Sequence, residues 1–322
     1  MPPDSLTYEI VDVFTDRAFA GNPLAVVYGA ESLSDGQLLA LAMEFNLSET
    51  SFPQPLTDAD RAAGADYRVR IFTPAGELPF AGHPTLGTAW ALRQRSVIGA
   101  GARVQSCGVG LIKVEVPADP QAPVALTATP RDAPSRLTTT QAERAATLVG
   151  VGRGDVAGAA FTAGCGLTWL YLRVTPTAVS RARAASGLVV ELGIDSASLL
   201  DPLEGVCVYA DLSADGPAPS QLGGESTQVS VNARVFVPGP GVPEDPATGS
   251  AAAGLGLVLV ASGSAAPAAS TSYQITQGVD MGRPSLLSGT VEAVDGTAVR
   301  CRVAGQVVAV ASGTIAIPPS QP

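Results

Sequence analysis

Two short motifs contain the residues best suited to chemistry. His83 and Asp245 each begin an X-Pro-x-x-Gly stretch that leads into an apolar, alanine-rich segment. A proline one residue inside a helix start, after a side chain that accepts hydrogen bonds, is typical of an N-cap. Capping explains Asp245 about as well as catalysis does. Histidine, however, is a mediocre cap, and His83 is the only imidazole in the chain, which favours a chemical role there.

The same two helix starts are candidate anion sites. The first amides of a helix lack intrahelical partners and carry about half a positive charge. Gly82 and Gly249 would let a ligand approach the backbone, and Ser250 would add a hydroxyl donor. Because only one of the 19 basic residues is a lysine, we expect these backbone groups, rather than lysine side chains, to hold an organic carboxylate.

Both motifs belong to an internal repeat. Arg70-Ile-Phe-Thr-Pro74 matches Arg234-Val-Phe-Val-Pro238 at an offset of 164 (234 minus 70), and His83 matches Asp245 at an offset of 162 (245 minus 83). The recurring order of strand, proline loop, X-Pro-x-x-Gly and helix predicts two similar domains. Arg70 and Arg234 are then expected to pair with acidic neighbours at equivalent places.

The elements that must position these motifs follow from hydrophobic periodicity and turn residues. Strands are expected over residues 8–14, 23–28, 49–53, 67–72, 104–107, 111–116, 168–174, 206–212 and 228–237. Helices are expected between Ser34 as N-cap and Asn46, over about ten residues from near His83, near residues 142–149, and from Asp245 through the apolar stretch 251–261. Residues 117–136, rich in proline and alanine, are interpreted as a linker or crossover between the domains.

Composition excludes several classes of protein. The 322 residues carry a net charge of -10 without a basic cluster, so nucleic acid is not an expected partner. The apolar stretch 251–261 is about half as long as a membrane-spanning helix, which predicts a buried helix and no membrane insertion. Four scattered cysteines and no N-terminal signal pattern favour a cytoplasmic protein, although the thiols could pair in space.

The sequence also contains few residues that could bind a metal ion or a cofactor. One histidine and no C-x-x-C spacing predict that no metal is bound. The only lysine, Lys113, alternates with apolar neighbours and is expected to face solvent, which disfavours a pyridoxal enzyme. Gly150-Val-Gly-Arg-Gly154 raises the alternative of a nucleotide-dependent oxidoreductase, but its spacing is not G-x-G-x-x-G, and a loop is the better interpretation.

Five ordered motifs resemble a known family. They are Asn22-Pro-Leu-Ala-Val, Asn46-Leu-Ser-Glu-Thr-Ser-Phe52, Phe80-Ala-Gly-His-Pro-Thr85, Glu244-Asp-Pro-Ala-Thr-Gly-Ser-Ala251 and Gln277-Gly-x-x-Met-Gly-Arg-Pro-Ser285. Together they are similar, nearly end to end, to the phenazine-biosynthesis PhzF-like isomerases of the diaminopimelate epimerase-like superfamily. The resemblance implies an α+β fold of two pseudo-symmetric domains, each a curled, mostly antiparallel sheet around a central helix.

The resemblance also implies an organisation and a function. We expect domains at residues 1–122 and 123–322, with the last strand, about 306–320, crossing back to the first. Family membership implies a homodimer and an isomerase that needs no cofactor and acts on a small carboxylic acid bound between the domains. Phenazine synthesis itself does not follow, because fold and family do not fix the substrate.

Residue roles follow from the same resemblance. Glu49, the glutamate of the Leu-Ser-Glu-Thr motif, would move a proton between carbon atoms. His83 and Asp245 would be its polar partners, and Gly82, Gly249 and Ser250 would hold the carboxylate. Without the resemblance, Glu49 is an ordinary acidic residue at a strand start. One base would give an allylic isomerisation and two would give epimerisation, and the sequence leaves both open. A non-catalytic carboxylate-binding protein with the same cleft is the alternative.

Overall fold

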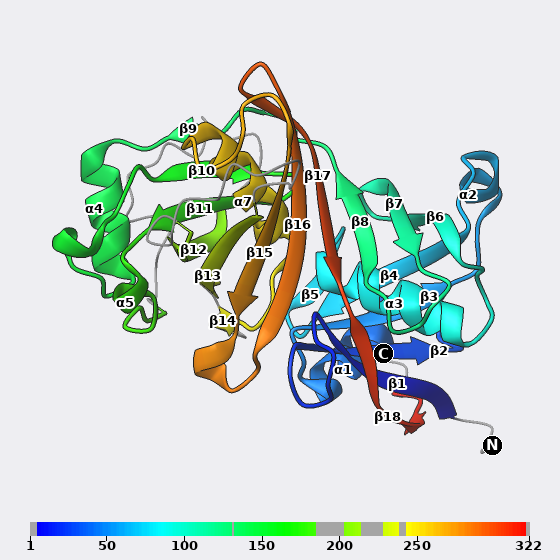
Figure 1. The fold of residues 1–322 in the computed structure, drawn as a ribbon. Helices are drawn as coiled ribbons and strands as arrows, with labels where there is room; N and C mark the ends of the chain where they lie inside the picture. The colour runs from blue at the N-terminus through cyan, green and yellow to red at the C-terminus, as the bar shows by residue number, and fades with distance from the viewer. Residues whose placement is uncertain (1–4, 131, 185–202, 214–227, 238–242, 320–322) are drawn as a thin grey trace. The chain divides into compact units, whose positions relative to one another are not determined.

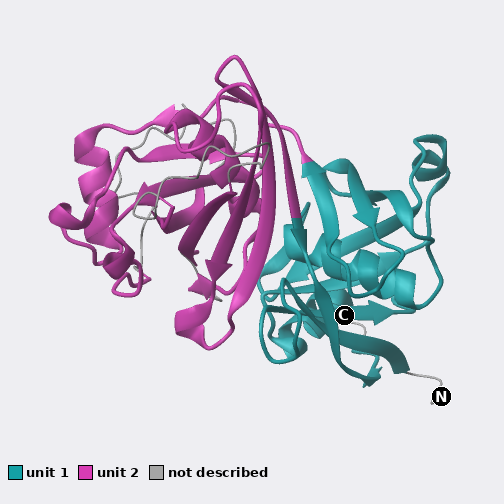
Figure 2. Ribbon diagram, in the orientation of Figure 1, with its two compact units in different colours: residues 1–127, 304–322 teal, residues 128–303 magenta. Residues whose placement is uncertain are grey.

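A computed structural model describes residues 5–130, 132–184, 203–213, 228–237 and 243–319 (Figure 1). The chain forms two compact units. Unit 1 combines Met1–Thr127 with Ala304–Pro322, and unit 2 is the continuous segment Ala128–Val303 (Figure 2). Strands dominate both units, and the longest helix of each unit packs against its own strands.

Unit 1 is built on a mostly antiparallel sheet. Strand β18 pairs with β1, β1 with β2, and β3 with β4 in antiparallel fashion, whereas β2 with β3 and β4 with β6 are parallel. The short β5 pairs with β4, and β6, β7 and β8 form an antiparallel run. The strands are β1 (Ser5–Val13), β2 (Asn22–Tyr28), β3 (Glu49–Gln54), β4 (Tyr67–Thr73), β5 (Gly76–Leu78), β6 (Gly101–Cys107), β7 (Gly110–Val116), β8 (Val124–Ala128) and β18 (Val307–Ala316).

Unit 2 repeats this pairing strand for strand. Strand β10 pairs with β11 in antiparallel fashion, β11 pairs with β12 in parallel, and β12 pairs with β13 in antiparallel fashion. Strand β13 also pairs with the short antiparallel strand β14 and with the parallel strand β15, and β15 pairs with β16 in antiparallel fashion. The strands are β9 (Ser135–Arg136), β10 (Phe161–Gly164), β11 (Thr168–Arg173), β12 (Leu203–Asp211), β13 (Gln228–Phe236), β14 (Glu244–Asp245), β15 (Ser270–Gln277), β16 (Ser285–Val294) and β17 (Thr297–Gly305). The predicted internal repeat is therefore present in the topology.

A central helix occupies the equivalent place in each repeat. Helix α3 (Gly82–Gln94) packs against β1, β2, β3 and β7 of unit 1, and α7 (Gly249–Ala261) packs against β10, β11 and β16 of unit 2. Residues 249–260 are buried without exception, as the apolar stretch predicted. Gly254 permits this packing, since a Cβ there would lie 2.1 Å from the Tyr171 hydroxyl, which donates to the Ala251 carbonyl at 2.8 Å.

The remaining helices begin with side-chain caps or lie on short turns. Helix α1 (Asp35–Phe45) begins with a capping box between Ser34 and Gln37 and ends at Asn46, whose φ of 50° is left-handed, as both predicted boundary residues required. Capping boxes also begin α2 (Asp58–Ala62) and α4 (Thr139–Leu148). The short elements are α5 (Pro176–Val179), η1 (Arg153–Asp155) and η3 (Val279–Met281).

The prediction of a linker over residues 117–136 was wrong in part. Two strands, β8 and β9, lie within it, and Val124 to Leu126 are buried. Strand β8 has no alternation of apolar and polar residues that would predict a strand, and it is a strand because it pairs with β7. The loop interpretation of residues 150–154 agrees with the single turn η1, and Lys113 is exposed as expected. No helix within the described ranges has the length and apolar character needed to cross a membrane.

Candidate active site

Glu49 and His83 lie together in unit 1. Asn46 ends α1 in a left-handed conformation, and the chain enters β3 at Glu49, which stands opposite Leu24 of the parallel strand β2. His83 is the second residue of α3, and its Nδ1 lies 3.5 Å from Oε2 of Glu49. The Pro23 carbonyl, also on β2, accepts a hydrogen bond from the imidazole. Three elements thus place one carboxylate beside one imidazole.

Burial keeps this imidazole neutral. His83 is 3% exposed, and the desolvation of its charged form lowers its pKa from 6.5 to about 3, against a smaller opposing effect of the hydrogen bond with Pro23. The contact with Glu49 is therefore not an ion pair at neutral pH. Nε2 of His83 is buried and has no partner among the described residues. A neutral ring with its other nitrogen engaged presents Nε2 as an acceptor.

The starts of the two central helices, α3 and α7, have no side-chain cap. Among the described helices of ten or more residues, α1 and α4 have capping boxes, whereas α3 and α7 have no side-chain hydrogen bond to their first amides. The N-cap of α3 is Ala81, which has no side-chain acceptor. The N-cap of α7 is Thr248, whose hydroxyl donates elsewhere. Amides at both helix starts are therefore available to an anion.

Of the two helix starts predicted at these motifs, one was right and one was wrong. Helix α3 begins at Gly82, next to His83 as predicted, and His83 lies inside the helix. Helix α7 begins at Gly249, four residues after Asp245, which belongs to β14. The proline rule failed because the segment from Asp245 to Thr248 is held in another conformation by hydrogen bonds: Oδ2 of Asp245 accepts from the Thr248 hydroxyl at 2.6 Å.

The other predicted residues gather at the start of α7. Gly249 and Ser250 are its first two residues, and both are buried. The Trp169 indole N–H donates to Oγ of Ser250 at 3.2 Å. Because this bond occupies the oxygen of Ser250, its hydroxyl proton can be directed to another acceptor. Unit 2 therefore brings Asp245, Gly249 and Ser250 together, as unit 1 does with Glu49, Gly82 and His83.

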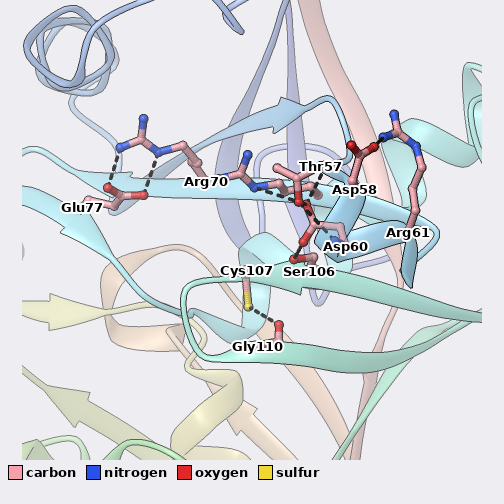
Figure 3. A network of polar contacts seen from close by, with 10 residues as sticks. Thr57, Asp58, Asp60, Arg61, Arg70, Glu77, Ser106, Cys107 and Gly110 are labelled. Carbon is pink, nitrogen blue, oxygen red and sulfur yellow. Dashed lines mark hydrogen bonds and ion pairs between the residues drawn. The ribbon is translucent and has the colours of Figure 1, made fainter. Parts of the chain in front are cut away.

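The repeated arginines brace the hairpins that precede the two helices. Arg70 binds Glu77 through two hydrogen bonds of 2.8 and 2.6 Å (Figure 3), and Arg234 binds Glu244 through two of 2.8 and 2.7 Å. Each arginine thus joins β4 to β5 or β13 to β14, as the predicted pairing with acidic neighbours required. Such bidentate pairs fix geometry as well as charge.

A second polar network joins α2 to β6. Asp60 accepts hydrogen bonds from the Ser106 hydroxyl and from the backbone and hydroxyl of Thr57 (Figure 3), and these bonds lower its pKa to about 2. A cavity of about 240 Å³ opens beside this network, between Arg68, Arg70 and Cys107, and none of the predicted site residues lines it. Within the described residues, no three His, Cys, Asp or Glu side chains gather closely enough to hold a metal ion.

Sequence reasoning assigned no role at the site to two residues that hold its side chains by hydrogen bonds. Trp169 lies outside the five motifs, yet its indole N–H donates to Ser250. Pro23 was quoted only as part of a motif, yet its carbonyl holds His83. The proximity of Asn22-Pro23 to His83 could not be found without the pairing of β2 and β3, whereas the tryptophan N–H, a donor that seeks a partner when buried, was a usable signal.

Comparison with known proteins agrees with this architecture. Residues 11–313 match the family of phenazine biosynthesis-like proteins, PhzC-PhzF. An uncharacterized isomerase of Pasteurella multocida is 30% identical over 313 residues, covering 97% of this chain and 94% of that protein. The trans-2,3-dihydro-3-hydroxyanthranilate isomerase of Pseudomonas fluorescens is 30% identical over 317 residues, covering 96% and 99%.

Solved structures show the same fold. A phenazine biosynthesis protein of the PhzF family from Bacillus anthracis superimposes with a TM-score of 0.79 at 19% identity, covering 97% of this chain and 99% of that chain. A hydroxyproline epimerase from Agrobacterium vitis superimposes with a TM-score of 0.61 at 14% identity, covering 98% and 94%. The fold is thus shared with PhzF-family proteins and with a hydroxyproline epimerase, and the full-length relatives at 30% identity are named isomerases. The chain belongs to the phenazine biosynthesis-like PhzC/PhzF family.

Proposed function

We propose that this isomerase moves a proton between carbon atoms of a small carboxylic acid, with Glu49 as the acid and base. The observation that carries the proposal is the placement of Glu49 beside His83 at the start of α3, a helix without a side-chain cap. Removing a proton from carbon requires a base within reach and stabilisation of the negative charge that forms. The carboxylate supplies the first, and helix amides supply the second.

In the proposed reaction only a proton moves. The Glu49 carboxylate takes the proton from one carbon, and the C–H electron pair passes into the conjugated system of the substrate. The resulting carboxylic acid of Glu49 then returns the proton to another carbon in an allylic isomerisation. A return to the opposite face of the same carbon would require a second base and would give epimerisation. No step requires oxidation, reduction or a cofactor.

His83 and Asp245 are the proposed polar partners. As a neutral ring, His83 would accept a hydrogen bond from the substrate at Nε2 rather than donate as an imidazolium. The carboxylate of the substrate would bind the amides of Gly82, Gly249 and Ser250, with the Ser250 hydroxyl as a further donor. Buried amides arranged before the reaction stabilise charge at little reorganisation cost. We further propose that the protein acts as a homodimer, which sedimentation equilibrium would test.

The test is hydrogen exchange from solvent into substrate. The first compound to assay is trans-2,3-dihydro-3-hydroxyanthranilate, the substrate named for the Pseudomonas fluorescens enzyme, followed by other small unsaturated or amino acids. In deuterium oxide, the wild-type protein should incorporate deuterium at carbon, and Glu49→Gln should lose at least a thousandfold of that rate while still binding ligand. Glu44→Gln, a substitution of an exposed glutamate on α1, is the matched control. Exchange retained by Glu49→Gln would refute the role of Glu49.

A further inference from the structure

Gln277 holds the segment that contains Asp245. It is the last residue of β15 and is 2% exposed. Its Nε2 donates to the Asp245 carbonyl at 2.8 Å and to Oγ1 of Thr248 at 3.1 Å, and its Oε1 accepts from the Thr248 amide at 3.3 Å. Both amide protons and the amide oxygen of one side chain are thus bound to residues about thirty positions earlier in the chain.

These bonds fix the direction of the Thr248 hydroxyl. Because its oxygen accepts from Gln277, its own proton is left to donate, and Oδ2 of Asp245 lies 2.6 Å away. An ionised carboxylate only accepts, so the donation runs from Thr248 to Asp245. A threonine at an N-cap ordinarily turns this oxygen toward the second or third amide of its own helix. In α7 it does not, and the first amides of that helix have no side-chain acceptor.

The backbone after Gln277 permits this close approach. Gly278 has a φ of +74°, and a Cβ at that position would lie 2.6 Å from the Pro246 carbonyl oxygen and 2.3 Å from that of Arg283. Any larger residue would push the end of β15 away from the segment between Asp245 and Thr248. The turn then closes through the Arg283 amide, which donates to the Gly278 carbonyl at 3.0 Å. The fifth sequence motif, residues 277–285, thereby acquires a physical role.

Unit 1 contains a related clamp at α3. Gln105 on β6 is fully buried, its Nε2 donates to Oγ1 of Thr85 at 3.0 Å, and the Thr85 hydroxyl donates to the carbonyl of Ala81 at 2.9 Å. Strands β6 and β15 occupy equivalent places in the repeat. Each unit therefore anchors the start of its central helix through a buried glutamine and a threonine.

We propose that Gln277 is a positioning residue that directs the Thr248 hydroxyl to Asp245, so that Thr248 orients this carboxylate and leaves the start of α7 open to the carboxylate of the substrate. The inference rests on the proposed function for the roles of Asp245, Gly249 and Ser250. Without Gln277, the oxygen of Thr248 is free to cap α7 and to compete with the bound anion. Loss of the glutamine should then weaken anion binding through Thr248 rather than through misfolding.

The competition predicts a rescue by a second substitution. Gln277→Leu should weaken the binding of benzoate, an unreactive cyclic carboxylate, about five-fold, the factor that corresponds to a typical N-cap hydrogen bond. Thr248→Val cannot cap the helix, so the double variant Gln277→Leu/Thr248→Val should regain an affinity within two-fold of wild type. Gln274→Leu, on the same strand but outside the set of clamp hydrogen bonds, is the matched control and should bind benzoate as wild type does.

Titration calorimetry of these proteins with benzoate measures the affinities. Equal affinity of Gln277→Leu and wild type, or a double variant as weak as Gln277→Leu, would overturn the inference. In steady-state kinetics, Gln277→Leu should raise KM about five-fold and lower kcat, whereas Thr248→Val should lower kcat about ten-fold with KM nearly unchanged, since only the orientation of Asp245 is lost. Absence of wild-type exchange would refute the proposed function, and the benzoate series would still decide the role of Gln277.

Discussion

The protonation state of His83 makes a quantitative prediction about stability. The imidazole is 3% exposed, and burial lowers its pKa to about 3. In the unfolded chain it should titrate near 6.5. Since the unfolded state takes up a proton more readily, the free energy of unfolding should be highest above pH 6.5 and should fall as the pH decreases toward 3. His83→Asn removes this dependence, and no other histidine exists to obscure it.

The size of the effect follows from the two pKa values. A pH of 5 is 1.5 units below the pKa of histidine in the unfolded chain, which is therefore protonated, while His83 in the folded protein is still neutral. At about 1.36 kcal/mol per unit, wild type should lose about 2 kcal/mol between pH 8 and pH 5 in excess of the loss in His83→Asn. Carboxylates titrate in both proteins, so their contribution cancels in the difference.

Urea denaturation followed by circular dichroism at pH 8, 7, 6 and 5 measures this difference. Proton NMR of the single imidazole gives the folded-state pKa directly, and His83 should show no titration above pH 5. Parallel pH dependence of unfolding in the two proteins, or an imidazole that titrates near pH 6.5 in the folded state, would refute the argument that burial keeps this ring neutral.

Two further predictions concern packing and ion pairs. Gly254→Ala should destabilise the protein by about 2 kcal/mol, because the new Cβ would collide with the Tyr171 hydroxyl. Gly154→Ala is the control, because a Cβ at Gly154 would meet no other atom. Equal melting temperatures of the two variants would contradict this account. Arg234→Met should lower the free energy of unfolding by about 3 kcal/mol, because Glu244, which is only 14% exposed, would lose its partner. Arg70→Met should lower it by about 1 kcal/mol, because Glu77 and Asp35 are 41% and 82% exposed and water can solvate them. Chemical denaturation that ranks the two variants in the opposite order would contradict the role of burial.

Local signals in the sequence predicted much of the fold. Ser34 and Asn46 bound α1 because a capping box and a left-handed cap are encoded within a few residues. The repeat of Arg70 and Arg234 predicted equivalent ion pairs because the same hairpin recurs with an acidic residue on its second strand. The buried helix was also predicted from a local signal, because residues 251–261 carry no charged or polar side chain.

Interactions between distant residues explain what could not be predicted. Asp245 was expected to begin a helix, but hydrogen bonds from Gln277 hold the following residues outside the helix, and α7 begins only at Gly249. Strand β8 was taken for linker because its pairing with β7 is not visible in an alanine-rich sequence. The proximity of Glu49 and His83 depends on the packing of α3 against β2 and β3, which no local pattern contains.

The place of β18 in the fold has a consequence for biosynthesis. Residues 307–316 complete the sheet of unit 1 by pairing with β1, whereas unit 2 is one uninterrupted segment. Because translation proceeds from the N-terminus, the edge of β1 that pairs with β18 stays unpaired until residues 307–316 have left the ribosome, and unpaired strand edges promote aggregation. All residues of unit 2 are synthesised before β18, so unit 2 can fold first, and the unpaired edge of β1 needs protection, by a chaperone or by delayed folding, until residues 307–316 emerge.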